Sequence, residues 1–137
     1  MTLASLQSAD MRNARGFTLI ELLIVVAVIG ILATLAMTLY GSMQQRARVS
    51  KVQADLRSIA SAASAFQAHT GALPPDIASL TATASNPDGA SAGPFLNAMP
   101  TLPTGGTPTW GAYAYVSNAN GTFTISAQGD GTTISVP

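Results

Sequence analysis

The segment that decides the fold is Arg15-Gly16-Phe17-Thr18-Leu19-Ile20-Glu21, which leads directly into the run Leu22–Tyr40. This run contains no charged residue and no proline. As a helix it would be about 28 Å long at roughly 1.5 Å per residue, close to the thickness of the hydrocarbon core of a bilayer. The Glu21 carboxylate lies at the start of this segment. Its presence there needs an explanation, because hydrocarbon supplies a carboxylate with no partner. The sequence therefore predicts a membrane-spanning helix with one acid of special function.

Other interpretations of this segment are weaker. Glu21 taken alone could be a boundary residue whose carboxylate reaches toward lipid headgroups. A secretory signal peptide has an apolar core of about 7–15 residues, and the run here is longer and carries Glu21. An ordinary membrane anchor would not need the string between Gly16 and Glu21. Basic residues occur on both sides of the span, so a positive-inside count does not place the N-terminus in the cytoplasm.

The string Gly16-Phe17-Thr18-Leu19-Ile20-Glu21 resembles the processing site of prepilins, the precursors of type IV pilins and type II secretion pseudopilins. The resemblance implies that residues 1–16 are a leader, which a prepilin peptidase removes between Gly16 and Phe17. It also implies N-methylation of Phe17 and a cytoplasmic position for the leader. Translation could start at Met1 or at Met11, and the latter would give a six-residue leader.

The same resemblance gives Glu21 a function. Glu21 becomes the fifth residue of the mature chain, one helical turn from the new amine of Phe17 and on its face of the helix. In a staggered bundle, the Glu21 carboxylate of one subunit can meet the Phe17 amine of the next. Because a buried ion pair often barely offsets its desolvation, we expect Glu21 to set the assembly register more than the affinity.

The apolar pattern continues past the span with spacings of three and four residues. The positions are Val49, Val52, Leu56, Ile59, Ala63 and Phe66. This spacing forms one face of a helix, which we expect to pack on the sheet of the same chain. Gly71 and Pro74 end the helix.

The sequence thus predicts one helix from about Phe17 to His69. Residues 17–40 form its transmembrane or filament-core half, and residues 41–71 form its amphipathic half. Gly30 and Gly41 weaken this helix. Two states of residues 30–38 on assembly are compatible with the sequence: unwound between Gly30 and Thr38, or helical, since Thr38 keeps its backbone N–H.

Residues 72–137 hold all eight prolines of the chain and only three charges. We expect residues 72–109 to be a connecting loop with one short helix from Ile77 to about Ala82, capped by Asp76. Residues 110–137 then form an antiparallel β-meander. Its predicted strands are Trp110–Val116, Thr122–Ala127 and Thr132–Val136.

The dipeptides Asn120-Gly121 and Asp130-Gly131 mark the two hairpin turns of this meander. In its first strand, Tyr113 and Tyr115 would lie on one face and Trp110 on the other. The predicted fold class is therefore α+β, a pilin fold in which one long N-terminal helix packs on a small three-stranded antiparallel sheet.

The second half of the chain also resembles major pseudopilins of type II secretion. The similar segments are Leu73-Pro74-Pro75, Gly93-Pro94-Phe95-Leu96, Met99-Pro100 and Gly129-Asp130-Gly131. Major pseudopilins commonly bind calcium through an acidic loop near the C-terminus, which needs about six or more oxygen ligands. Asp130 is the only acid after Asp88, so we expect neither a calcium site nor any other cofactor. Many pilins close a C-terminal loop with a disulfide, for which this chain has no cysteine.

No residue pattern in the chain suggests catalysis. It offers no carboxylate pair, no nucleophile with a base and no phosphate-binding glycine loop. The single histidine, His69, falls at the predicted helix end, where we expect a surface or capping role. We therefore predict a structural subunit and not an enzyme. Direct nucleic-acid binding is not expected, because residues 72–137 contain no Lys or Arg to neutralise phosphates.

The predicted function is that of a type IV filament subunit, which polymerises with copies of itself. Its further partners would be the prepilin peptidase, an inner-membrane assembly platform, minor pseudopilins or pilins, and membrane lipid before assembly. The preferred filament is the pseudopilus of a type II secretion system, with this chain as its major pseudopilin. The first alternative is a major or minor pilin of a surface type IV pilus used for motility, adhesion or DNA uptake.

A second alternative is a membrane-tethered binding module that never polymerises. In the filament interpretations the chain first spans the inner membrane once, with its C-terminal domain outside the cytoplasm. It then enters a periplasmic or cell-surface filament.

Overall fold

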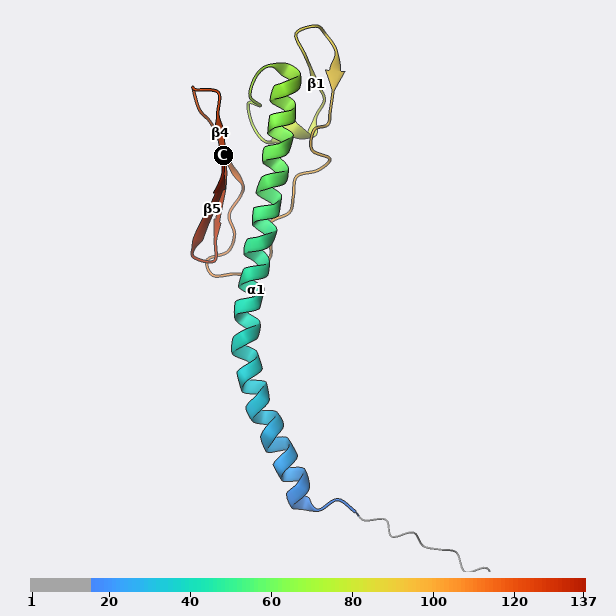
Figure 1. The fold of residues 1–137 in the computed structure, drawn as a ribbon, viewed down its shortest axis with the longest axis vertical. Coiled ribbons are helices and arrows are strands. Elements are labelled where there is room, and N and C mark those ends of the chain that lie inside the picture. The colour runs from blue at the N-terminus through green and yellow to red at the C-terminus, as the bar shows by residue number, and fades with distance from the viewer. Residues whose placement is uncertain (1–15) are drawn as a thin grey trace, which may run out of the picture. The chain divides into compact units, whose positions relative to one another are not determined.

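The computed structural model describes residues 16–137. Two compact units make up the chain, the first ending at Tyr40 and the second covering Gly41–Pro137. Helix α1, Leu19–Thr70, contributes to both units (Figure 1). Residues 1–15 of the predicted leader lie outside the described residues. They include Met11, Arg12 and Arg15.

The first unit contains the first half of α1, and every one of its described residues is exposed. The helix begins at Leu19, whereas the sequence analysis expected about Phe17, because Thr18 is the capping residue before the first turn. Two hydroxyl groups inside the apolar half bond to backbone carbonyls of the preceding turn: Thr34 Oγ1 to Gly30 O at 2.8 Å and Thr38 Oγ1 to Leu35 O at 2.9 Å. These hydroxyls therefore need no partner from the surroundings of the helix.

The second half of α1 carries the predicted apolar stripe into a buried core. Val52, Leu56, Ile59 and Ala63 are fully buried. They belong to one cluster with residues from the rest of the second unit, which are Leu80, Leu96, Trp110, Tyr113, Phe123, Ile125 and Ala127. The helix ends at Thr70, where Gly71 adopts a φ of 76° and donates its N–H to Gln67 O at 2.8 Å. A glycine is favoured at this left-handed position because other residues are strained there.

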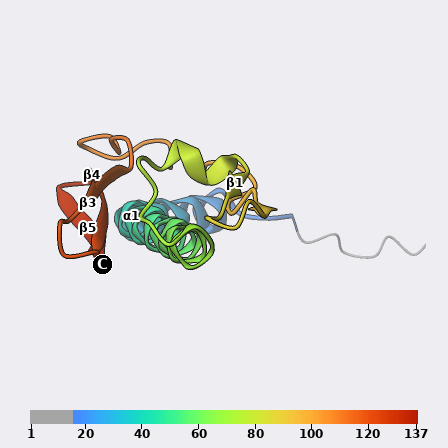
Figure 2. The ribbon, with the colours of Figure 1, turned by 90° about the horizontal axis from the view of Figure 1, so that it is seen from above.

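The predicted three-stranded antiparallel sheet is confirmed. Its strands β3 (Ala114–Ser117), β4 (Phe123–Gly129) and β5 (Thr132–Val136) pair in the order β3-β4-β5. Strand β4 alternates between the core and solvent, because successive side chains of a strand point to opposite faces. Figure 2 shows the sheet on one side of the second half of α1, with the segment that contains β1 on another side. The helix is thereby covered on two sides within this unit.

The prediction for the first strand of the meander was wrong in two respects. Strand β3 begins at Ala114 and not at Trp110. Trp110 and Tyr113 do not lie on opposite faces, since both are buried in the core cluster. The reason is that residues 110–113 are outside the strand, so its two-residue alternation does not apply to them. Gly129 leaves room for the Trp110 ring: a Cβ there would lie 2.6 Å from Trp110 Cγ.

The connecting segment contains a hairpin that the sequence analysis did not predict. Strands β1 (Ala84–Ser85) and β2 (Ser91–Ala92) pair antiparallel across a turn. Within this turn Gly89 donates its N–H to Asn86 O at 3.0 Å, and Asn86 Oδ1 accepts from Ala90 N at 2.7 Å. The sequence Asn86-Pro87-Asp88-Gly89 has typical turn chemistry. Its flanks are short Ala and Ser residues with low strand propensity, which is why this hairpin was missed.

The short helix of this segment is also smaller than predicted. It is a single 3₁₀ turn, η1 (Ala78–Thr81), in place of a helix from Ile77 to about Ala82. Ile77 occupies the cap position, but the Asp76 carboxylate does accept a hydrogen bond from Ser79 N at 2.8 Å. Leu80 O then accepts two hydrogen bonds, from Phe95 N and Leu96 N, both at 2.9 Å. These bonds stop the helix from continuing and fix the fully buried Leu80 in the core.

Candidate functional site

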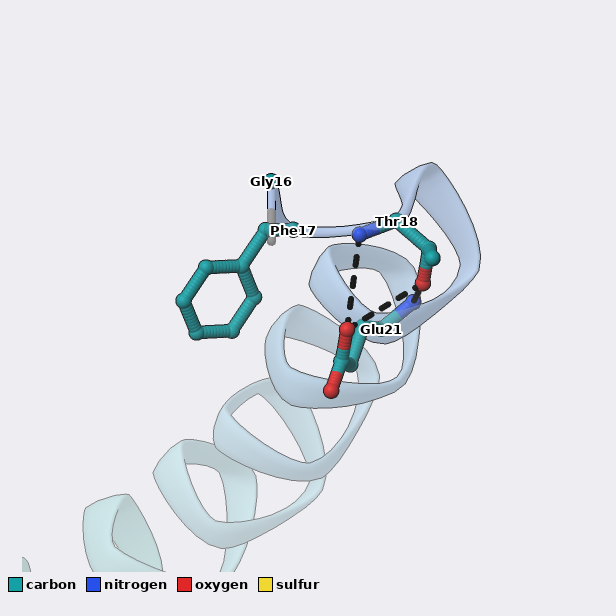
Figure 3. A pocket seen from close by; sticks show the side chains of 4 residues that line it. All are labelled: Gly16, Phe17, Thr18 and Glu21. Atoms are coloured by element: carbon teal, nitrogen blue, oxygen red, sulfur yellow. Dashed lines mark hydrogen bonds between the residues drawn. The ribbon is translucent and has the colours of Figure 1, made fainter. Parts of the chain in front are cut away.

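The candidate site is the N-terminal end of α1. Gly16, Phe17, Thr18 and Glu21 line one surface hollow there, as Figure 3 shows. Gly16, Phe17 and Thr18 precede the helix, and Glu21 lies in its first turn. The structure thus brings together the two residues of the predicted cleavage bond and the acid predicted to set the register.

Thr18 and Glu21 bond to each other in both directions. Glu21 N donates to Thr18 Oγ1 at 3.2 Å, while Glu21 Oε2 accepts from Thr18 N at 3.4 Å and from Thr18 Oγ1 at 3.2 Å. This is the capping box, in which a Thr at the cap and a Glu three residues later satisfy amide groups that the first turn leaves unpaired. The Thr-x-x-Glu spacing of residues 18–21 is a sequence signal for this box, which was not predicted.

The capping box has two consequences for Glu21. Its carboxylate is held at the helix N-terminus, where the helix dipole favours a negative charge. It also remains open to a stronger partner, because the contacts with Thr18 are long. Among residues 16–137, Glu21 forms no ion pair. A cation brought to this end of the helix would therefore find an uncompensated carboxylate.

The bond between Gly16 and Phe17 is accessible. Phe17 is 84% exposed, and a Cβ built on Gly16 would meet no atom within 4 Å. Neither residue is helical. A protease needs an unobstructed backbone at the bond that it cuts, and these two residues are exposed and lie outside the helix. The cleavage itself stays a prediction.

Large apolar side chains continue from this end along the first unit. Leu23, Ile29, Leu35 and Tyr40 are each more than half exposed, as are most of their apolar neighbours. By length and composition α1 is apolar enough to cross a membrane. So much exposed apolar surface fits a segment whose surroundings are lipid or other apolar helices.

A second polar centre surrounds Asp130, in the turn between β4 and β5. Arg48 binds its carboxylate through two nitrogens, with Nε to Oδ2 at 2.7 Å and Nη2 to Oδ1 at 3.0 Å. Trp110 Nε1 donates to Oδ2 at 3.1 Å, and Thr107 N donates to Oδ1 at 3.2 Å. The Asp130 side chain is 4% exposed. These bonds, above all that from Arg48, hold the pKa of the Asp130 carboxyl below its usual value, and the Asp130 bond raises the pKa of the Arg48 guanidinium.

The sequence predicts Asp130 as a hairpin-turn residue but does not predict its pairing with Arg48. One sequence signal for the pair was available. Arg48 precedes the buried Val52 by four residues, so both lie on one side of the helix. Its partner, however, is 82 positions away in the sequence, and no local pattern indicates it.

The surroundings of Asp130 do not fit a calcium ion. Both carboxylate oxygens are already bonded to N–H donors, and one of these donors is a cationic guanidinium. Calcium requires several oxygen ligands. The described part of the chain contains no group of three or more His, Cys, Asp and Glu residues that could hold a metal.

Comparison with known proteins begins with the N-terminus. Residues 11–37 match the model of the prokaryotic N-terminal methylation motif. This range includes Gly16, Phe17 and Glu21. No solved structure matches the chain significantly.

Curated relatives resemble part of the chain. It is 44% identical over 61 residues to the fimbrial protein EcpB of Eikenella corrodens, covering 44% of this chain and 38% of EcpB. It is 35% identical over 78 residues to the type II secretion system core protein G of Pseudomonas aeruginosa, covering 57% of this chain and 55% of that protein. It is 46% identical over 52 residues to the type IV major pilin protein PilA of Myxococcus xanthus, covering 38% of this chain and 24% of PilA.

The matches thus span between about a quarter and just over half of the length of these relatives. The chain carries the prokaryotic N-terminal methylation motif and is similar to type IV pilins and to a type II secretion core protein.

Proposed function

We propose that this chain is a structural, non-enzymatic subunit of a type IV filament. The observation that carries the proposal is the division of α1 into an exposed apolar half, which begins with Glu21, and a half that is buried in its own domain. A water-soluble protein would not leave so much apolar surface uncovered. The exposed half therefore needs lipid before assembly and copies of itself afterwards.

The first step in this function is processing. A prepilin peptidase would cut between Gly16 and Phe17, and Phe17 would become N-methylated. The motif match over residues 11–37 and the exposed, non-helical backbone at this bond support this step. The subunit would then wait in the inner membrane, with its second unit outside the cytoplasm, until an assembly platform extracts it. Minor pilins or pseudopilins would join it in the filament.

Glu21 would act in the second step, assembly. Cleavage creates a positive amine at Phe17, and the Glu21 carboxylate of a neighbouring subunit is a suitable partner. In the described chain this carboxylate has only its own Thr18 as a partner. An amine would replace these long bonds with a charge-assisted one, which gains strength where water is excluded. Glu21 would thereby fix the register between subunits.

We favour a type II secretion pseudopilus as the filament, with this chain as the major pseudopilin. The alignment with core protein G extends over 78 residues, further than the 61 and 52 residues shared with the fimbrial protein EcpB and the pilin PilA. The alternative, a surface type IV pilus, is favoured by the higher identity to those two proteins. Electron microscopy of filaments sheared from the cell surface, compared with secretion assays on a deletion strain, separates the two.

We also propose that the subunit folds without calcium or another cofactor. The support is the Arg48–Asp130 pair, which places a guanidinium where a calcium loop would need further oxygen ligands. No part of the proposed function requires catalysis or contact with nucleic acid.

Processing and assembly are tested separately in the native bacterium. Mass spectrometry of the membrane-bound chain should find an N-terminus at a methylated Phe17. A chain that still begins at residue 1 or 11 would refute the processing step. Glu21→Ala should be processed and inserted like the wild type, but filaments should be reduced about tenfold or more, since each subunit would lose a buried charge partner.

The control is Thr18→Ala, which removes the hydroxyl of the capping box and keeps the Glu21 carboxylate. It should weaken the first turn by about 1 kcal/mol and leave most of the filaments intact. If Glu21→Ala also leaves filament yield and register unchanged, the chain is better described as a membrane-tethered module that does not polymerise through this acid.

A further inference from the structure

The charges of the second unit are few and balanced. Residues 41–137 contain four cations and four anions: Arg46, Arg48, Lys51 and Arg57 against Asp55, Asp76, Asp88 and Asp130. Two pairs form inside the unit. Arg48 binds Asp130 at 2.7 Å, and Lys51 binds Asp55 at 2.6 Å. Four charges therefore remain without an ionic partner among the described residues, and all four side chains are on exposed residues.

The two unpaired cations lie on one face of α1. Arg46 and Arg57 are eleven residues apart, which is close to three turns at 3.6 residues per turn, and so about 16 Å along the helix. By the same geometry they point away from the stripe of Val52, Leu56 and Ile59, which faces the core. This face of the helix is exposed at both positions. It presents two guanidinium groups in a fixed row.

The two unpaired anions lie in the segment between α1 and the β3–β5 sheet. Asp88 is in the turn of the β1–β2 hairpin, and Asp76 precedes η1. This hairpin lies beside the C-terminal end of α1, because His69 Nε2 is 3.1 Å from Ala90 O. Figure 1 shows it next to that end of the helix. His69 lies twelve residues beyond Arg57, or about 18 Å further along the helix.

We propose that Arg46 and Arg57 of one subunit pair with Asp76 and Asp88 of a second copy of this chain. The partner is a copy of the chain because its unpaired charges match in number and are opposite in sign. Copies lying side by side without a shift would bring like charges to the same level. A shift along the helix axis would bring Arg57 of one copy to the level of the hairpin that carries Asp88 in another copy, so this contact specifies a staggered arrangement. The proposal rests on the filament function and names the surface through which neighbouring second units meet.

A competing partner for the two arginines is the anionic surface of a membrane. That partner would use Arg46 and Arg57 but would leave Asp76 and Asp88 without a role. The contact between copies uses all four residues. It also predicts that exchanging the signs of the two sets restores the interaction, which a membrane cannot do.

The test uses the full chain in its native bacterium and measures the yield of assembled filaments. Arg46→Asp with Arg57→Asp should lower the yield about tenfold or more, because like charges would then face each other. Asp76→Arg with Asp88→Arg should lower it in the same way. The four substitutions together should restore most of the wild-type yield. A control, Gln53→Glu with Gln128→Glu, adds two negative charges at other exposed positions and should keep the yield.

Further measurements separate the possible failures. Each variant must accumulate as mature chain and show the wild-type unfolding midpoint by Trp110 fluorescence, so that a folding defect is recognised. Because the chain has no cysteine, Arg57→Cys with Asp88→Cys permits cross-linking of copies by a short bis-maleimide. Cross-linked ladders in filaments are expected with this variant and not with Gln53→Cys and Gln128→Cys.

The outcomes are distinct. If the wild type makes no filament, the proposed function itself fails. If the wild type makes filaments and the arginine variant makes as many, the paired surface is refuted while the filament function stands. If the arginine variant fails but the aspartate variant does not, and the combination gives no rescue, the arginines serve a membrane surface and the contact between copies is refuted.

Discussion

Both halves of α1 are helical, but the apolar side chains of the first half are exposed, whereas those of the second half's apolar stripe are buried. In the first half, Leu32 is 60% exposed, and all of its neighbours in the helix are exposed as well. In the second half, Leu56 is fully buried within a cluster that includes residues of η1 and of strand β4. The difference arises from what the chain itself supplies. Residues 72–137 pack on the second half within their own unit, whereas the side chains of the first half are exposed and suited to lipid or to other subunits.

The largest expected effect follows from this contrast. Leu56→Ala should lower the free energy of unfolding of the second unit by about 2–5 kcal/mol, because it leaves a cavity in a packed core. Leu32→Ala removes the same atoms from the first half and should change that free energy by less than about 0.5 kcal/mol. Both changes would be measured by urea unfolding of the full chain in detergent micelles, with Trp110 fluorescence as the signal. Equal effects would show that the two halves are not energetically distinct.

A pair of glycines sharpens the comparison. Gly129→Ala places a Cβ 2.8 Å from Trp110 Cα, with the Trp110 ring closer still, and should cost about 1–3 kcal/mol through overpacking. In Gly30→Ala the new Cβ meets no atom within 4 Å, so the stability of the second unit should not change. In the first half it should strengthen the helix by up to about 1 kcal/mol. Amide hydrogen exchange, which reports each half separately, measures both effects in one experiment. Faster exchange near Gly30 in its variant would contradict the second expectation.

How far the sequence predicts this molecule depends on the range of each interaction. The spacing from Val52 to Phe66 predicts the buried stripe, and Asp130-Gly131 predicts the turn between β4 and β5, because both are local patterns. The Arg48–Asp130 pair and the packing of Trp110 over Gly129 join distant segments, so no local pattern contains them. At the candidate site, the family motif indicates Gly16 and Phe17 as the cleavage bond and Glu21 as the register acid. It did not indicate that Thr18 and Glu21 cap the helix, which is a separate property of the same residues.

The next prediction concerns Asp130, whose side chain is only 4% exposed, in contrast to exposed Glu21. The folded-state pKa of Asp130 lies below its ordinary value of 3.8. Its contribution to stability is therefore fully present well above pH 3.8 and is lost as the pH falls through the lower folded-state pKa. Asp130→Asn should lower the urea midpoint at pH 7 and flatten its decline below about pH 5. The midpoint is followed by far-ultraviolet circular dichroism, which reports the backbone, because the Trp110 side chain itself contacts Asp130.

The matched control for that experiment is Asp88→Asn. Asp88 is exposed and has no ionic partner among the described residues. This variant should keep both the midpoint at pH 7 and the slope of the wild type in acid. If Asp130→Asn keeps the wild-type slope as well, the Arg48 pair does not stabilise the unit.

The smallest expected effect is that of calcium on the unfolding midpoint. It tests whether the turn between β4 and β5 is held by the Arg48–Asp130 pair or by a metal ion. In this chain the Asp130 carboxylate accepts hydrogen bonds from Arg48, Trp110 and Thr107, which occupy the positions where a metal would bind. Removal of calcium by EDTA, or its addition at millimolar concentration, should leave the unfolding midpoint of the second unit unchanged. A rise on adding calcium would show that an ion displaces the guanidinium. Arg48→Gln provides the complementary test, because it removes the guanidinium from the Asp130 carboxylate. A single acid with neutral neighbours still lacks the oxygen ligands that calcium needs. This variant should therefore be less stable than the wild type, and calcium should not restore its stability.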